Sequence, residues 1–139
     1  MDMSTGSGSL VNWGAFSQAR TELGASFVRI LGYFREDGVK SVAQIEEAMR
    51  SHNSAALVLP AHTLKGEARQ FGADPLSELA ETIETIARDC VERHDTPEKA
   101  LEHVVRLRPL FESTLQLLER EANPLVERRP AAFGRRPAA

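Results

Sequence analysis

The chain has 139 residues, of which 42% are apolar and 27% charged, with a formal net charge of −3. This length and balance are typical of one domain with a single hydrophobic core. The acidic net charge argues against a general attraction to nucleic acid, and the absence of any apolar run near ~20 residues excludes a transmembrane helix, so neither kind of partner is expected.

The cysteine content and the N-terminal sequence predict the compartment. Cys90 is the only cysteine, so no disulfide can form within the chain. The first ten residues lack the basic start and the apolar stretch of a secretory signal. We therefore expect a cytoplasmic protein.

Composition divides the chain into three parts. Residues 1–10 are rich in Ser and Gly and are expected to form a flexible lead. Residues 123–139 are rich in Pro and Arg and are expected to form a disordered basic tail. Residues 11–122 show helical periodicity and no alternating strand pattern, which predicts that they form the folded domain.

The folded part begins with two predicted helical regions. Asn12 can cap a short first helix that contains Trp13 and Phe16. Apolar residues then recur at helical spacing over 27–49. Gly38 interrupts this region and is a possible bend or break.

Two further helices follow, separated by one short turn. Asn53 can cap a helix over 54–71, and Gly72 stands where a left-handed residue would end it. Asp74 can cap the next helix, with Pro75 at its first position. The apolar stripe of that helix consists of Leu76, Leu79, Ala80, Ile83, Ala87 and Cys90.

A second cap-then-proline pattern, at Thr96 and Pro97, precedes the last predicted helix. Its apolar residues are Leu101, Val104, Phe111, Leu115 and Leu118. Four substantial helices with short connections predict an all-α fold, an antiparallel four-helix bundle with a short additional N-terminal helix. A domain of this size is expected to be a monomer.

The helix over 54–71 carries the candidate functional residues. At ~100° per residue, one stripe of this helix must face the core. The stripe consists of Leu57, Ala61, Leu64, Ala68 and Phe71. His62 lies off this stripe, so its imidazole is expected to reach solvent.

Three residues around His62 form a candidate reactive group. An imidazole with an ordinary pKa of ~6.5 keeps a nitrogen lone pair near neutral pH. Lys65, one turn away, is expected to face solvent and to reach an anion bound at the ring. Gly66 costs helix stability, about 1 kcal/mol relative to alanine, and leaves room for a group attached to His62 or for the loop of a partner. The same outward face supplies the candidate partner-binding residues Val58, Leu59, Arg69 and Gln70.

The spacing His62-x-Leu64-Lys65-Gly66, with Gly72 six residues further on, resembles the signature of histidine-containing phosphotransfer (Hpt) domains. The similarity continues through Leu76, Ala80, Ile83 and Glu84. The resemblance implies a phosphorelay intermediate without kinase or ATPase activity of its own. By this resemblance, the chain would receive phosphate from a hybrid or conventional histidine kinase and exchange it with response-regulator receiver domains.

The resemblance also implies a role for each site residue. His62 would be phosphorylated on the ring nitrogen farther from the backbone, Lys65 would orient the phosphoryl group and Gly66 would leave space for it. The chain would bind no cofactor, because the receiver domain brings the Mg²⁺ together with its aspartate. Such a transfer depends on positioning and charge stabilisation, so no catalytic base is needed.

Glu67 departs from the family pattern, which has Ser or Ala after the first glycine. It is expected to lie at the edge of the core and to pair with Arg69 or a neighbouring helix. Because Glu67 could weaken the positive field at His62, an alternative function remains open, that of a bundle that binds a signalling partner without being phosphorylated.

Two other functions fit the sequence less well. A kinase dimerisation helix usually has an acidic residue directly after its histidine and a proline a few residues later, where this chain has Thr63 and Gly66. A metal site is not expected, because the four histidines show no ligand-pair spacing and Cys90 lies on an apolar stripe.

Overall fold

The computed structural model describes residues 10–122, and its regular elements are all helical. The predicted lead, except Leu10, and the predicted tail lie outside the described residues. The helices are α2 (Trp13–Leu23), α3 (Phe27–Arg50), α4 (Ser54–Gln70), α5 (Asp74–Arg93) and α6 (Leu101–Ala122), with 3-10 turns at Gly24–Ser26 and Glu98–Ala100. The predicted all-α bundle is therefore confirmed.

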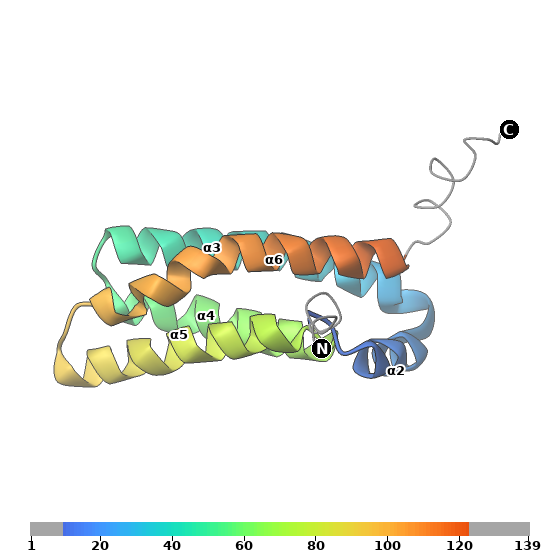
Figure 1. Cartoon of the computed structure of the whole chain (residues 1–139), viewed down its shortest axis with the longest axis horizontal. Helices are drawn as coiled ribbons and strands as arrows, with labels where there is room; N and C mark the ends of the chain where they lie inside the picture. The colour runs from blue at the N-terminus through green and yellow to red at the C-terminus, as the bar shows by residue number, and fades with distance from the viewer. Residues whose placement is uncertain (1–9, 123–139) are drawn as a thin grey trace, which may run out of the picture.

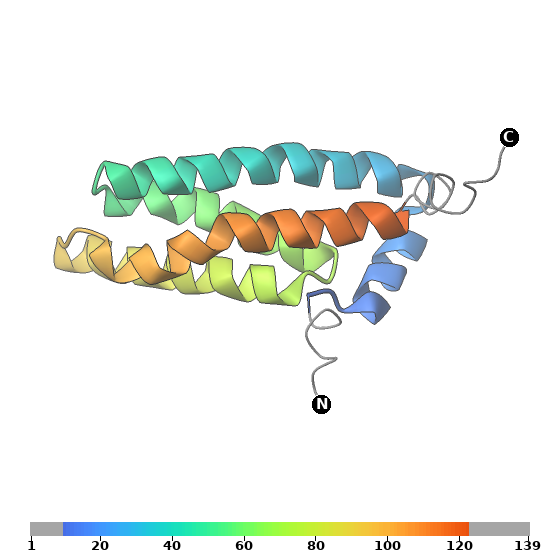
Figure 2. The ribbon, with the colours of Figure 1, turned by 45° about the horizontal axis from the view of Figure 1, so that its top comes forward.

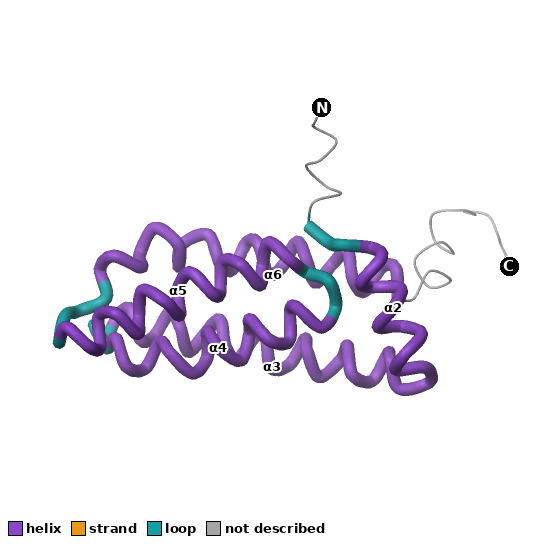
Figure 3. The backbone as a smooth tube through the Cα atoms, turned by 90° about the horizontal axis from the view of Figure 1, so that it is seen from below, coloured by secondary structure: helices purple, strands orange, loops and turns teal. Residues whose placement is uncertain are grey.

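The four long helices lie along a common axis and form two layers. α3 and α6 lie together in one layer, and α4 and α5 in the other (Figure 1). Each long helix packs against two others, and the most extensive packing joins α4 to α5. The short helix α2 lies across one end of the bundle (Figure 2). Seen from below, α4 and α5 run side by side in the layer nearer the viewer (Figure 3).

The predicted helix boundaries are mostly confirmed. The Asn12 and Asn53 side chains each accept a hydrogen bond from the backbone N–H three residues on, at 3.1 Å. Gly72 follows α4 with a φ of 77°, a conformation that favours glycine. The prediction for Asp74 was wrong, because α5 begins at Asp74 itself and Ala73 precedes it without a side-chain cap. The Asp74 carboxylate instead lies in the first turn, where the helix dipole favours a negative charge.

Gly38 neither bends nor breaks its helix. α3 runs without interruption through this position. A Cβ on Gly38 would overlap the ring of Phe111 on α6, so the glycine allows the two helices to approach closely. Apolar spacing alone could not distinguish a break from a close approach.

The core is built from the apolar stripes of the long helices. The stripe predicted on α5 is buried along its whole length. Five phenylalanine rings form a continuous row through the core, in which the centroids of neighbouring rings lie 5.3–5.8 Å apart. From one end of the row to the other, they belong to Phe16, Phe27, Phe71, Phe34 and Phe111. Leu101 is an exception to the prediction, because it is 51% exposed where α6 begins after a 3-10 turn.

None of the helices between residues 10 and 122 combines the length and the apolar character needed to cross a bilayer.

Candidate functional site

His62 lies in the middle of α4, on the face that α4 shares with α5. Its side chain is 56% exposed, as expected from its position off the core stripe. Its Nδ1 atom lies 3.0 Å from a carboxylate oxygen, Oε2, of Glu84 on α5. The imidazole is therefore held at one nitrogen and open at the other.

Glu84 is the residue around which the site is organised. Its side chain is only 7% exposed, although it carries a carboxylate. The Lys65 ammonium lies 2.9 Å from Oε1, and the Arg88 guanidinium donates from Nε and Nη2 to Oε2 at 2.9 and 2.8 Å. The two carboxylate oxygens thus face donors from three side chains, which is what a buried charge requires.

The charge state of Glu84 fixes the protonation pattern of the imidazole. Burial raises the pKa of the Glu84 carboxyl, but hydrogen bonds from Lys65, Arg88 and His62 outweigh burial and lower that pKa to about 2. At neutral pH the carboxylate can only accept hydrogen bonds. Nδ1 of His62 therefore carries the hydrogen, and a neutral ring keeps its lone pair on Nε2, the nitrogen farther from the backbone.

Lys65 does not face solvent as the helical angle predicted. Its side chain is only 19% exposed, and its ammonium is engaged with Glu84. The angular position of a residue on α4 does not reveal that a carboxylate on α5 lies within reach. The stem of Lys65 therefore extends from α4 toward Glu84 on α5 instead of into water.

Gly66 lies one turn beyond His62 and is exposed. A Cβ at this position would meet no atom within 4 Å outside its own helix. The packing of the described chain therefore gives no reason for a glycine here. The space beside Gly66 is therefore free for a group attached to the imidazole or for a loop of a partner protein.

A comparison with family models agrees with this geometry. The model of the Hpt domain matches residues 29–123, which is more than half of the chain. The chain belongs to the Hpt domain family. Members of this family relay phosphate between kinases and receivers and typically act as phosphocarriers without a catalytic kinase domain. Neither a curated protein nor a solved structure matches the chain significantly.

The matched region of this Hpt domain contains α4, α5, α6 and nearly all of α3, whereas α2 lies before it. All the residues that meet at His62 lie inside the match. α2 is attached to the bundle by its own contacts. The backbone N–H of Asn12 donates to the carbonyl of Gly72 at 2.7 Å, and Arg20 donates to the last carbonyls of α6.

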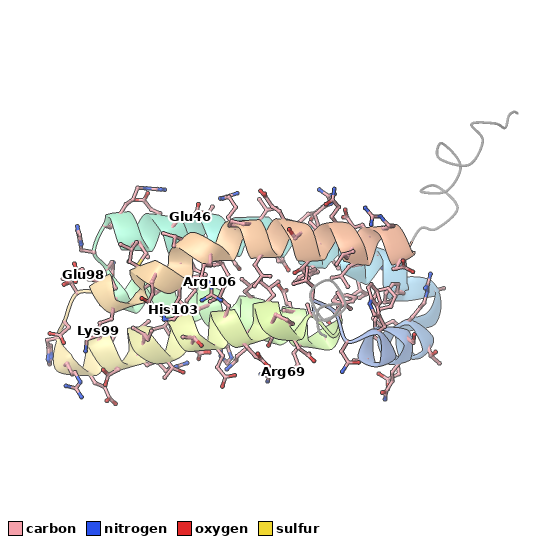
Figure 4. The ribbon with its side chains drawn as sticks, in the orientation of Figure 1. Glu46, Arg69, Glu98, Lys99, His103 and Arg106 are labelled. Atoms are coloured by element: carbon pink, nitrogen blue, oxygen red, sulfur yellow. The ribbon has the colours of Figure 1, made fainter. Side chains whose placement is uncertain are left out.

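The four candidate partner-binding residues of the Hpt domain differ in exposure. Leu59 is 71% exposed, and Arg69 and Gln70 are exposed near the end of α4. Val58 is half-buried and packs against the core. Arg69 projects below the bundle in Figure 4, on the face that Figure 3 views.

Glu67 of the Hpt domain turns away from His62. Of the two contacts expected for Glu67, the structure shows the one with a neighbouring helix and not the one with Arg69, whose guanidinium lies 3.6 Å from Glu81 on α5. Glu67 is half-buried and faces the carboxyl group of Asp37 on α3. Burial first, and then the Asp37 carboxyl, raise the pKa of Glu67 to about 7. Glu67 therefore keeps its proton to a higher pH, because it is partly desolvated and lies beside a second carboxyl group.

This carboxyl pair predicts that stability falls as pH rises toward neutrality. In the unfolded chain Glu67 releases its proton near its ordinary pKa of 4.5, whereas the folded chain holds it until about pH 7. Folding binds a proton in that window, so the stabilisation is complete below pH 4.5 and is lost between pH 4.5 and about 7. Between pH 4.5 and about 7, the unfolding free energy of the wild type should therefore fall by about 1–2 kcal/mol, whereas that of Glu67→Gln should not. The effect is no larger because water still screens a half-buried carboxyl.

Urea unfolding at several pH values measures this difference. Asp37→Asn should flatten the pH dependence in the same way, because it removes the other half of the pair. Glu36→Gln, an exposed neighbour on α3, is the control and should follow the wild type. If the unfolding free energies of the wild type and of Glu67→Gln changed in parallel with pH, folding would bind no proton at Glu67.

Sequence reasoning missed two residues of the site. Glu84 was noted only as part of the family spacing, and Arg88 was not considered. A glutamate beside the buried Ile83 and three residues before the buried Ala87 was the available signal, since a carboxylate at such a position needs partners. Arg88 stands one turn after it, at the spacing of a helical ion pair.

Among the described residues, no group of three or more His, Cys, Asp and Glu side chains is arranged to hold a metal ion.

Proposed function

We propose that His62 accepts a phosphoryl group on Nε2 and exchanges it with the aspartate of a response-regulator receiver domain. The observation that carries this proposal is the hydrogen bond between Nδ1 and the buried Glu84 carboxylate. It leaves Nε2 as the exposed nucleophilic atom and keeps the ring in one orientation. The membership of the chain in the Hpt family supports the same assignment.

The transfer balances without a general base on this chain. The Nε2 lone pair forms the bond to phosphorus, while the bond from phosphorus to the aspartate oxygen breaks and leaves a carboxylate. The ring then carries a positive charge and keeps its hydrogen on Nδ1, where Glu84 accepts it. The reverse step regenerates the neutral imidazole. The receiver domain would supply Mg²⁺ to the phosphoryl oxygens, so the proposal requires no cofactor bound by this chain.

The partner must cover the surface around His62 to bring its aspartate to Nε2. A stable interface buries about 800 Å² on each partner, which extends well beyond a single side chain. We propose that this interface includes Leu59, Arg69 and Gln70, the exposed residues one to two turns from His62. Val58 contributes less, because it already packs against the core.

α5 adds an apolar residue that the sequence did not indicate. Val91 is 41% exposed and stands one turn after Arg88, as Leu59 stands one turn before His62. Because α4 and α5 run antiparallel (Figure 3), the first half of α4, which contains Leu59, lies beside the last part of α5, which contains Val91. A receiver domain with an apolar patch beside its acidic aspartate site would complement this face.

The alternative of an unphosphorylated interaction bundle rested on Glu67. That side chain points toward Asp37 on α3 and is not among the groups around His62. The reason for expecting a weakened positive field at the imidazole is therefore removed, and phosphotransfer is the function that the geometry supports best.

Incubation with a phosphorylated receiver domain tests the proposal. The wild type should take up acid-labile phosphate, whereas His62→Gln should take up none and still fold, because His62 is largely exposed. His52→Gln is a matched control, since His52 is also exposed and also bonds a glutamate, Glu98, through Nδ1 at 3.2 Å. Equal uptake by the wild type and His62→Gln would disprove the assignment, and so would no uptake by the wild type from any receiver.

A further inference from the structure

We propose that Arg88 is the phosphoryl-binding cation of this site, and that it leaves Glu84 for the phosphoryl oxygens when His62 is phosphorylated. This inference rests on the proposed function of His62. It differs from the role that the family resemblance implies, in which Lys65 orients the phosphoryl group.

The two cations at Glu84 are held very differently. The side chain of Lys65 is 19% exposed, and its ammonium lies against Oε1. The side chain of Arg88 is 59% exposed, and its guanidinium reaches Oε2 from the solvent side. Moving Lys65 would leave the buried Oε1 without the cation beside it, whereas moving Arg88 leaves Oε2 with the Nδ1–H of His62.

Arg88 is also the cation that already lies beside the imidazole. Its Nη2 atom and Nδ1 of His62 are both within hydrogen-bond distance of one oxygen, Oε2 of Glu84. The Arg88 side chain is long and exposed, so rotation about its bonds can move the guanidinium away from Oε2 and toward the phosphoryl group on Nε2. The guanidinium presents five N–H donors in a planar fork that matches phosphate oxygens, which an ammonium cannot do.

The charge balance of the site favours the exchange. Before transfer, one negative carboxylate faces two cations, Lys65 and Arg88, and a neutral ring. After transfer, the ring at His62 is positive and still donates from Nδ1 to Glu84, while the phosphoryl group adds two negative charges. Three cationic groups then compete for one carboxylate, and the only anion without a partner from this chain is the phosphoryl group.

Chemical phosphorylation separates this inference from docking by a partner. Phosphoramidate transfers its phosphoryl group to imidazole, so that its P–N bond breaks, a P–Nε2 bond forms and ammonia leaves. The wild type, Arg88→Ala and Arg88→Lys would be phosphorylated in this way and compared by ³¹P NMR and by the rate of transfer to a receiver domain. Arg93→Ala is the matched control, because Arg93 on α5 is 65% exposed and pairs with Asp89 four residues before it.

We expect Arg88→Ala to shift the ³¹P resonance and to slow transfer about tenfold, with Arg88→Lys in between and Arg93→Ala unchanged. Arg88→Ala behaving like Arg93→Ala in both measurements would overturn the inference. A second outcome would also overturn the inference. If Arg88→Ala changed the ¹⁵N signals of the His62 ring in the unphosphorylated protein but not in the phosphorylated protein, Arg88 would only hold Glu84 in place. Failure of the wild type to take up phosphate on His62 would overturn the proposed function and this inference together.

Discussion

Glu84→Gln is expected to slow phosphoryl uptake by His62 on the order of tenfold to a hundredfold, although Glu84 touches no phosphoryl oxygen. The substitution keeps the size of the side chain and removes its charge. An amide can donate to Nδ1 as well as accept from it, so the ring is no longer held with its hydrogen on Nδ1. Molecules with the hydrogen on Nε2 have no lone pair there and cannot attack phosphorus.

The measurement combines uptake rates with ¹⁵N NMR of the His62 ring. Uptake should fall together with the fraction of the tautomer that has its hydrogen on Nδ1, and this correlation distinguishes positioning of the ring from general loss of structure. Glu81→Gln provides the control, because Glu81 also lies on α5 and pairs with a cation of α4 but is 53% exposed. If Glu84→Gln matched Glu81→Gln in uptake and in tautomer, the buried carboxylate would have no part in preparing the histidine.

The second large effect contrasts two glycines within helices. Gly38→Ala should destabilise the fold by about 1–3 kcal/mol, because its methyl group would overlap the Phe111 ring and force α3 and α6 apart. Gly66→Ala should stabilise the fold by about 0.5–1 kcal/mol, because a Cβ there meets nothing and alanine favours the helix. Thermal unfolding of both variants and of the wild type measures whether each substitution lowers or raises the stability.

In phosphoryl transfer the order of the two variants should be reversed, so that the less stable variant is the more active one. At temperatures where Gly38→Ala is folded, it should transfer phosphate normally, because the atoms nearest to a Cβ at Gly38 belong to Phe111 on α6 and not to the residues around His62. Gly66→Ala should bind a receiver domain less tightly or transfer the phosphoryl group more slowly, since its methyl group narrows the open space beside His62. A stabilised Gly66→Ala with unchanged transfer would mean that the space is not used.

Most of the fold could be predicted from periodicity and helix ends. The buried stripe of α5 and the caps at Asn12 and Asn53 depend on local sequence, and the structure confirms them. Gly38 could not be interpreted in the same way, because its role depends on Phe111, more than 70 residues away in the sequence. In a single sequence, a glycine that breaks a helix cannot be distinguished from a glycine that allows two helices to approach closely.

The site was predictable where it depends on one helix and not where it depends on two. The exposure of His62 and the openness at Gly66 follow from their positions on α4. The covered position of Lys65 and the turn of Glu67 toward Asp37 depend on which residues α5 and α3 present. Helical angles give the direction of a side chain, but they do not give the register of the neighbouring helix.

The residues around His62 come from α4 and α5 alone, a single helical hairpin. In the described part of the chain, α3 and α6 pack against this hairpin and contribute no side chain to the contacts of His62 and Glu84. Substitutions on the outer faces of α3 and α6 should therefore combine with site substitutions almost additively. Those faces are suitable places for spectroscopic labels or fusions, and sequence change there can create new binding partners while the phosphoryl chemistry is preserved.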